Sequence, residues 1–223
     1  MWGNFKRLAL VNFLYLLNFL KRSLTKKMKI EDAIKQRRSV RNFTTKEVPW
    51  KELTKVLEAA FHAPMAGNVF SVRCIVTKDV KKKRAIAKAC LEQRFLEEAS
   101  HLIIVCSDLE QVKPLYGDYA EIYGSQQAGA AIENMLLQAV ELGLAACWVG
   151  SFDEGSIKAL LKITKDMKVE AVIALGYEKG KTKVPPKQTM RRYFFFEEFG
   201  FPHGGRDMWQ TDFWGTKGDR FEK

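Results

Sequence analysis

The sequence is poor in the residues that mark fibrous and disulfide-stapled proteins. Its 223 residues include four cysteines, six prolines and fifteen glycines, and the glycines follow no repeat period. These low counts exclude collagen-like and mucin-like chains and a disulfide framework. A hydrophobic content of 47% excludes disorder over most of the chain. Because no Ser/Gly/Pro-rich linker divides the body of the chain, we expect one globular domain there.

The cysteines also lack the spacing of a metal site. Cys74, Cys90, Cys106 and Cys147 form no C-x-x-C pair and have no histidine placed beside them as a further ligand. We therefore expect no metal, plain buried thiols and a reducing, cytoplasmic compartment. Phosphate loops of the G-x-G-x-x-G and Walker types are absent as well, so no nucleotide held by such a loop is expected.

The positive charge is concentrated at the N-terminus. The formal net charge is +11, and residues 1–29 carry +7 of it because they hold seven Lys and Arg and no acid. Residues 30–223 therefore carry only +4. One alternative is a non-enzymatic protein that binds a membrane or nucleic acid through this basic leader and an aromatic tail. The weak charge of the body argues against it, since phosphate binding of that kind needs many surface cations.

Residues 1–28 form a basic, apolar extension that we expect to be helical. Its apolar run, Leu8 to Leu20, spans 13 residues and contains Asn12 and Asn18, whereas a membrane-spanning helix needs about 20 apolar residues. No small-residue cleavage site follows, so we expect no export. Three interpretations stay open: contact with a membrane surface, a packing arm on a partner subunit, and a leader before a start at Met28. The last two are favoured over membrane contact.

Helix and strand patterns alternate from residue 30 onward. The predicted helices cover Ile30–Arg37, the stretch after Pro49 as far as Ala63, Lys81–Cys90, a long segment stopped by Gly143, and a segment capped by Asp153. The predicted strands cover Val72–Val76, Leu102–Cys106, Ala145–Val149 and Val169–Gly176. For residues 107–125, which carry three tyrosines, both a lid over a substrate and a plain helix face remain open.

Two segments carry groups suited to an anionic ligand. The first, Arg37-Arg38-Ser39-Val40-Arg41-Asn42-Phe43, offers guanidinium forks that match phosphate and a hydroxyl that adds one hydrogen bond. Taken alone, it fits a solvated basic turn better. The second, Val149-Gly150-Ser151-Phe152, follows a strand and precedes a helix, so its amides are expected to be free to hold an acceptor.

Four segments in order resemble the nitroreductase family over about residues 28 to 192. They are RRSVRNF (37–43), APMAGN (63–68), GLAACWVGSFD (143–153) and ALGYEKG (174–180). The resemblance implies an α+β fold, in which a mixed, mainly antiparallel sheet lies between helices and a C-terminal segment wraps onto the partner subunit. It implies an FMN-binding domain over residues 29–200, followed by an aromatic C-terminal extension over residues 201–223. It also implies a homodimer with FMN at its interface.

The resemblance assigns cofactor contacts to the cationic segment. Arg37 and Ser39 look like the family's contacts to the FMN phosphate and ribityl chain, and Arg38 is the weakest match. Arg41 looks like the family's cation beside flavin N1 and O2, where a fixed guanidinium stabilises the negative charge of the reduced ring. Asn68 is similar to the asparagine that reaches the isoalloxazine edge from the neighbouring protomer.

The remaining contacts come from later in the chain. Gly150 and Ser151 would offer backbone N–H groups toward flavin N5 and O4, and Lys187 and Arg191 match a second set of phosphate cations. Cys147 belongs to the same motif, but a thiol beside a Trp is more often packing than nucleophile, so no catalytic residue is assigned. The chain departs from the family at Met65 and at Val69-Phe70-Ser71, where Ser or Thr and a Gln-Pro-Trp run are common.

The function that the resemblance implies is an FMN-dependent oxidoreductase. NAD(P)H would reduce flavin N5 and leave, and a nitroaromatic, quinone or similar conjugated acceptor would then take the electrons in a ping-pong scheme. Flavin-fragmenting synthases and reductive dehalogenases of the same fold are alternatives, which lids distinguish. We expect no nucleic-acid partner.

Overall fold

Four strands form one antiparallel sheet in the order β1-β2-β4-β3. The computed structural model describes residues 28–182, 193–195 and 199. The elements in chain order are α2 (Ile30–Gln36), α3 (Trp50–Ala60), η1 (Ala66–Asn68), β1 (Val72–Thr77), α4 (Val80–Ala89), α5 (Phe95–Glu98), β2 (His101–Asp108), α6 (Leu109–Tyr116), η2 (Gly117–Tyr119), α7 (Ala120–Glu141), β3 (Ala145–Val149), α8 (Glu154–Leu161) and β4 (Met167–Gly176). This α+β architecture confirms the predicted fold class.

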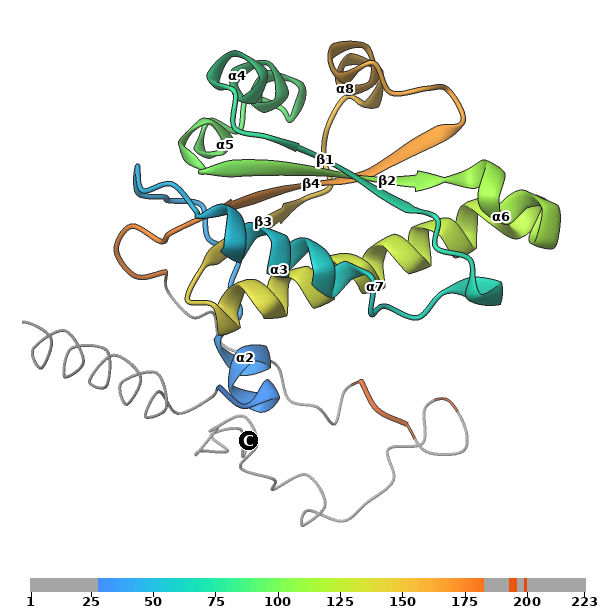
Figure 1. Ribbon diagram of the computed structural model, residues 1–223, viewed down its shortest axis with the longest axis horizontal. Coiled ribbons are helices and arrows are strands. Elements are labelled where there is room, and N and C mark those ends of the chain that lie inside the picture. The colour runs from blue at the N-terminus through green and yellow to red at the C-terminus, as the bar shows by residue number, and fades with distance from the viewer. Residues whose placement is uncertain (1–27, 183–192, 196–198, 200–223) are drawn as a thin grey trace, which may run out of the picture.

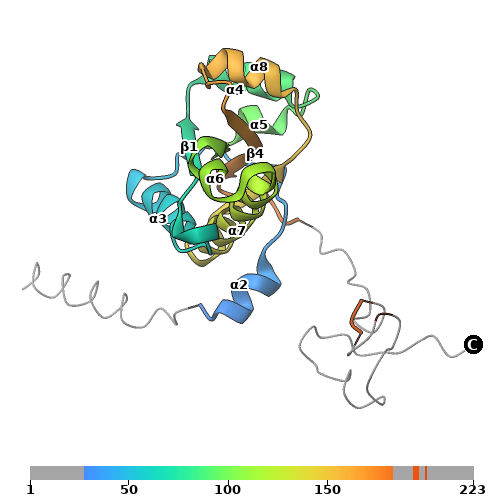
Figure 2. The same cartoon turned by 90° about the vertical axis from the view of Figure 1, so that its right-hand side faces the viewer.

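The sheet is the middle layer of three. Helices α3 and α7 cover one face, and α4, α5 and α8 cover the other, as both views show (Figures 1 and 2). Alternate residues of the central strands face the two layers, so Ile103 and Ile173 pack toward α7 whereas Leu102 and Val172 pack toward α4. All eight residues of β2 are buried, because the strand is central and covered on both faces.

The outer strand β3 receives the segment that follows α2. Ser39 forms a parallel bridge with Ala146, and the Val40 amide donates to the Ala146 carbonyl at 3.0 Å. A little further on, Phe43 forms an antiparallel bridge with Glu178. The four strands pair antiparallel throughout, and the parallel contribution comes from the Ser39 bridge. This docking aligns the cationic segment with the same strand that leads to Gly150.

The ends of two helices follow the chemistry of their sequence. Helix α7 ends at Glu141, and Gly143 adopts the left-handed φ of +70° that an L side chain disfavours. Helix α8 begins after Asp153, whose side chain accepts a hydrogen bond from the Ser156 amide at 2.6 Å. Both boundaries confirm the prediction from sequence, and the second one fixes the loop between β3 and α8.

The predictions differ from the structure at a few boundaries. Helix α3 ends at Ala60, and the chain continues to Ala63 in single turns rather than in the same helix. The short helix α5 was not predicted, and α6 falls in residues 107–125, for which a lid and a helix face were both left open. Residues 107–125 are helical over α6, η2 and the start of α7, and the rings of Tyr116 and Tyr123 meet edge to face with centroids 4.8 Å apart.

Several expectations fall outside the described residues. They are the helical extension over residues 1–28, the phosphate contacts of Lys187 and Arg191, the aromatic extension over residues 201–223, and the C-terminal segment that would wrap onto a partner. Among the described residues, no helix is both long and apolar enough to cross a membrane.

Candidate functional site

The cationic segment begins at the C-terminal end of α2, and its two leading arginines have partners. Arg37 Nε lies 3.2 Å from Glu133 Oε1 on α7, which leaves the rest of its guanidinium fork available. Arg38 donates through Nη1 to the carbonyls of Lys35, in the last turn of α2, and of Arg37, the residue that follows α2. One nitrogen of its guanidinium thus caps the helix end, and its Nε is buried without a partner among the described residues. The predicted cofactor contact of Arg38 stays a prediction.

Ser39 and Arg41 are exposed on the outer side of β3. Arg41 Cζ lies 5.9 Å from the centroid of the Phe95 ring. No carboxylate within residues 28–182 lies at ion-pair distance from Arg41. A guanidinium held over an aromatic ring without an acidic partner is suited to bind an anion.

The loop between β3 and α8 presents free amides, as the sequence predicted. Gly150 and Ser151 are exposed, and within residues 28–182 neither amide donates a backbone hydrogen bond. The loop is nevertheless fixed, because the Asp153 amide donates to the Ala89 carbonyl at 2.8 Å and the Asp153 side chain caps α8. Two oriented N–H groups on a rigid turn can hold an acceptor atom.

These two segments lie along one edge of the sheet, which we call the β3 edge: residues 37–41 and 150–151. Ser39 sits beside Ala146, and Gly150 is four residues further along, roughly 13 Å at the rise of a strand. Its free polar groups are guanidinium, hydroxyl and backbone N–H groups. FMN fits this set, since it is an elongated molecule with a phosphate at one end and ring acceptors N1, O2, O4 and N5 at the other.

Cys147 lies in the middle of this strand and is unsuited to nucleophilic chemistry. It is buried, and burial raises the pKa of its thiol, although the Arg41 guanidinium opposes the shift. The thiol therefore stays protonated near neutral pH and acts as packing. Among the described residues, no cluster of His, Cys, Asp and Glu could hold a metal ion.

Asn68 lies on the other side of the sheet. It ends η1, which leads directly into β1, and β1 and β3 are the opposite edges of the sheet. Its backbone φ of +58° follows a Gly67 φ of +59°, a left-handed pair that presents the exposed Asn68 at a turn. One chain therefore does not bring Asn68 to the β3 edge.

Sequence reasoning missed the groups that hold the Asn68 turn. Gln127 on α7 is buried beside it, and Arg73 forms an ion pair of 3.0 Å with Asp108. Tyr116 packs against Gly67, where an added Cβ would lie 2.9 Å from the Tyr116 hydroxyl. The one signal available was Gln127 itself, a polar residue between the apolar positions of a buried helix face.

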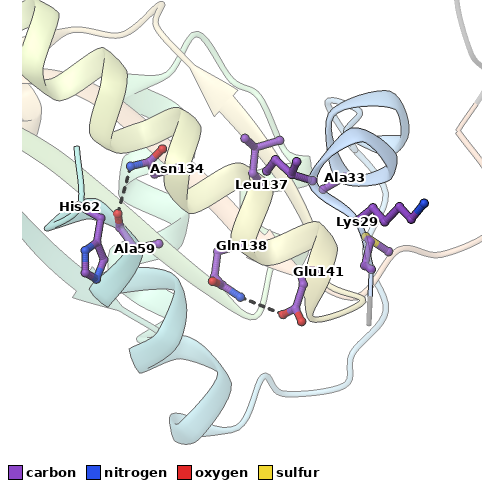
Figure 3. Close-up of a pocket in the computed structure, with 10 residues that line it drawn as sticks. Lys29, Ala33, Ala59, His62, Asn134, Leu137, Gln138 and Glu141 are labelled. Carbon is purple, nitrogen blue, oxygen red and sulfur yellow. Dashed lines mark hydrogen bonds between the residues drawn. The ribbon is translucent and has the colours of Figure 1, made fainter. Parts of the chain in front are cut away.

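Two clefts lie beside α7. The larger, of about 370 Å³, is formed by α2, α3 and α7 and contains none of the predicted FMN contacts; Figure 3 shows Asn134 bonded to the Ala59 carbonyl on its wall. The smaller, of about 190 Å³, is lined by Arg37, Arg38 and the start of β3. The smaller cleft therefore adjoins the β3 edge.

Comparisons with known proteins identify the family of the chain. The model of the nitroreductase family matches residues 34–94 and 91–177. A protein of Archaeoglobus fulgidus with the provisional name NADH dehydrogenase/NAD(P)H nitroreductase is 32% identical over 147 residues, 64% of this chain and 82% of that protein. An iodotyrosine deiodinase of Thermotoga neapolitana is 25% identical over 191 residues, 74% of this chain and 97% of that protein.

A solved structure resembles both the fold and the sequence. An FMN-dependent nitroreductase of Clostridium difficile R20291 superposes with a TM-score of 0.66 at 26% identity, over 75% of this chain and 98% of that one. The family model covers the cationic segment, the Asn68 turn and the β3–α8 loop. The chain therefore belongs to the nitroreductase family of oxidoreductases.

Proposed function

We propose that this protein is an FMN-dependent oxidoreductase that takes hydride from NAD(P)H and passes electrons to a conjugated organic acceptor. The observation that carries the proposal is the β3 edge, where the exposed Arg41 guanidinium, the Ser39 hydroxyl and the Gly150 and Ser151 amides have no acceptor partner within residues 28–182. The names of the relatives from Archaeoglobus fulgidus and Clostridium difficile support the donor and the cofactor.

The chain's residues would hold the cofactor along the strand. Arg37 and Ser39 would bind the phosphate and ribityl groups, with Lys187 and Arg191 as further phosphate cations. Arg41 would lie beside N1 and O2, and the Gly150 and Ser151 amides would donate to N5 and O4. When bound, FMN would supply the hydride acceptor at N5 and the electron store.

The protein groups would act by charge and by fixed geometry. Arg41 has no acidic partner among the described residues, so its full charge would stabilise negative charge on the ring. The rigid β3–α8 turn would hold its two amides without reorganisation during reaction. Water can deliver the protons, since the described part of the site offers no buried general acid.

The active unit we propose is a homodimer. Asn68 and the β3 edge lie at opposite sides of one sheet, so a second copy would have to bring its Asn68 to the flavin of the first. Exposed apolar side chains on α2 and β3 support such an interface, because Ile30 is 67%, Ile34 41% and Trp148 39% exposed. Four free cysteines suit the cytoplasm, which we propose as the compartment.

Turnover with a panel of acceptors tests the proposal. Full-length protein loaded with FMN would be assayed with NADH and NADPH against a nitroaromatic, a quinone and an iodotyrosine. Oxidation of the donor that depends on the nitroaromatic or the quinone is the expected result. Release of iodide alone would instead favour the dehalogenase alternative, for which the deiodinase relative is the reason. Lack of turnover with all three would contradict the proposal.

A further inference from the structure

We infer that Gln127 is a positioning residue that sets the geometry of the Asn68 loop, residues 66–71, for contact with the flavin. The identity of the ligand, FMN, rests on the proposed function, whereas the geometry of the loop comes from the structure. Gln127 lies in the N-terminal half of α7 and is 4% exposed. It is neither a predicted cofactor contact nor part of the β3 edge.

The Gln127 amide bonds to the loop on both sides of Asn68. In the orientation that satisfies both of its ends, its nitrogen donates to Ser71 Oγ at 3.1 Å and to the Val69 carbonyl at 3.0 Å. Its oxygen accepts from the Ala66 amide at 3.3 Å. One side chain thus fixes the entry and the exit of the turn.

The turn needs such an anchor because its own backbone favours it weakly. Gly67 and Asn68 are consecutive left-handed residues, with φ of +59° and +58°, and a left-handed conformation costs an L residue energy. The loop's own backbone bonds run from the Asn68 amide to the Met65 carbonyl at 3.3 Å and from the Val69 amide to the Ala66 carbonyl at 3.1 Å. Neither bond reaches Phe70 or Ser71, so the conformation of the whole loop also depends on contacts from outside it.

Other anchors hold only one end of the loop. The Asp108 amide donates to the Ser71 carbonyl at 2.8 Å, and Arg73 donates to the Phe70 carbonyl at 2.9 Å. Both contacts lie after Asn68. Before it, the side chain of Tyr116 packs on Gly67 without a hydrogen bond to the loop. Gln127 is therefore the polar side chain that joins the two halves in the described structure.

The chemistry of the bonds requires a neutral group that both donates and accepts. A Gln amide has two N–H donors and a carbonyl acceptor, whereas an ionised carboxylate accepts only. Gln127→Glu would leave the Val69 carbonyl unpaired and bury a charge, and Gln127→Leu would remove all three bonds at similar size. A protonated Glu would restore one donor and the acceptor.

The first test needs no cofactor. Amide hydrogen exchange would be measured on the full-length protein without FMN, in the wild type and in Gln127→Leu. Gln126→Leu is the control, because Gln126 is the preceding residue of α7 and its side chain is exposed. We expect exchange over residues 66–71 to rise in Gln127→Leu alone, with β2 and β4 unchanged. Unchanged exchange in the loop would overturn the inference, even if FMN does not bind and the proposed function fails.

The second test connects Gln127 to Asn68 through FMN affinity. Gln127→Leu should weaken FMN binding about tenfold if the loop then adopts the binding geometry about one tenth of the time, and the loss should nearly vanish in an Asn68→Ala background. A merely structural role would make the two losses add. Additive losses, or a Gln127→Leu protein with wild-type affinity, would contradict a positioning role.

A third variant, Gln127→Glu, tests the same hydrogen bonds through the pH dependence of FMN affinity. It replaces Gln127→Leu if that variant does not fold. In Gln127→Glu, burial raises the pKa of the introduced carboxyl. Lowering the pH should therefore protonate it and bring FMN affinity back toward the wild type, while the wild type changes little. An affinity of Gln127→Glu that is the same fraction of wild type at every pH would rule out the hydrogen-bond account.

Discussion

The β3 edge and the Asn68 loop differ in whether their polar groups have hydrogen-bond partners within the described structure. At the β3 edge, the Arg41 guanidinium and the Gly150 and Ser151 amides have no hydrogen-bond or ion-pair acceptor among the described residues. In the Asn68 loop, the backbone before and after Asn68 is bonded to Gln127, while Asn68 itself is exposed. The difference separates groups that are available to a ligand from groups that hold a ligand contact in place.

The largest effect is expected at the β3 edge. Arg41→Ala should lower kcat/KM for NAD(P)H oxidation by roughly a hundredfold, because a fixed charge beside the reacting ring is lost. Steady-state kinetics with FMN-loaded protein measures it. Arg41→Lys should recover part of the loss, since it keeps charge but not the planar fork. Arg84→Ala is the control, because Arg84 is exposed on α4 and pairs with Glu97; equal losses in both variants would refute the assignment.

Loss of an ion pair beside the Asn68 loop should lower the stability of the fold. Arg73→Ala leaves the Asp108 carboxylate, which is 10% exposed, without its cation, and should lower the free energy of unfolding by about 2 kcal/mol. Urea denaturation of the full chain measures it. Lys78→Ala breaks the exposed ion pair with Glu47 and should have no measurable effect. If the two variants lose the same stability, the Arg73 contact does not anchor the loop.

The same loop contains a glycine that the packing requires. Gly67→Ala should destabilise the protein by about 1 kcal/mol or more, because the residue is left-handed and the new Cβ would lie 2.9 Å from the Tyr116 hydroxyl. Gly143→Ala is the control, because Gly143 also has a positive φ, +70°, but has open space around it. The excess loss of stability in Gly67→Ala over Gly143→Ala, read from thermal unfolding, therefore reports the contact with Tyr116. Equal losses would show that this contact does not constrain Gly67.

Acid should weaken the turn at the β3 edge by a smaller amount. Hydrogen bonds from the Ser156 side chain and backbone lower the pKa of Asp153 below its ordinary value. A lowered folded-state pKa contributes stability above the unfolded pKa of about 4, and that contribution is lost as the pH falls through the folded value. Thermal unfolding of the wild type should therefore lose more stability than Asp153→Asn below about pH 4. If stability falls with pH equally in the wild type and in Asp153→Asn, ionisation of Asp153 does not contribute to stability.

No effect on turnover is expected from the buried thiol of Cys147 in β3. Cys147→Ala should keep wild-type kinetics, because burial raises the pKa of the thiol and keeps it protonated. Burial also raises the pKa values of Cys90 and Cys106 to about 12. Cys74 corrects the expectation of four buried thiols, because it is exposed at the outer strand β1. Its pKa is raised as well, to about 11, so all four thiols are mainly protonated near neutral pH. Slow alkylation of the native protein should therefore modify Cys74 first, because its sulfur is the accessible one. A large loss of turnover in Cys147→Ala, with FMN still bound, would show that Cys147 takes part in the reaction.

Sequence patterns predicted the β3 edge better than its counterpart. The segment of residues 37–41 contains three arginines and a serine, which are residue types suited to an anionic ligand. The strand–turn–helix order around Gly150 follows from local signals such as the Asp153 cap. The amides were expected to be free because a turn between elements has no ladder partner. The docking of Ser39 on Ala146 depends on contacts over a hundred residues apart and left no local pattern.

The Asn68 loop shows what local patterns omit. Asn68 was assigned through the APMAGN motif, but the role of Gln127 depends on a contact between Ser71 and α7, 56 positions apart in the sequence. Arg38 shows the converse, since a cation in the right motif is used by the carbonyls of its own helix end. Residue type and spacing predict which groups are present, and tertiary packing decides which of them stay free.

The most direct test of the account is an absorption spectrum of the full-length protein with FMN, recorded before and after anaerobic NADH or NADPH. We expect FMN to bind and its yellow bands to bleach on addition of a nicotinamide donor, with weaker binding in Arg41→Ala. Failure of the wild-type protein to bind FMN, or bound FMN that neither donor reduces, would contradict the assignment of the β3 edge as a flavin site.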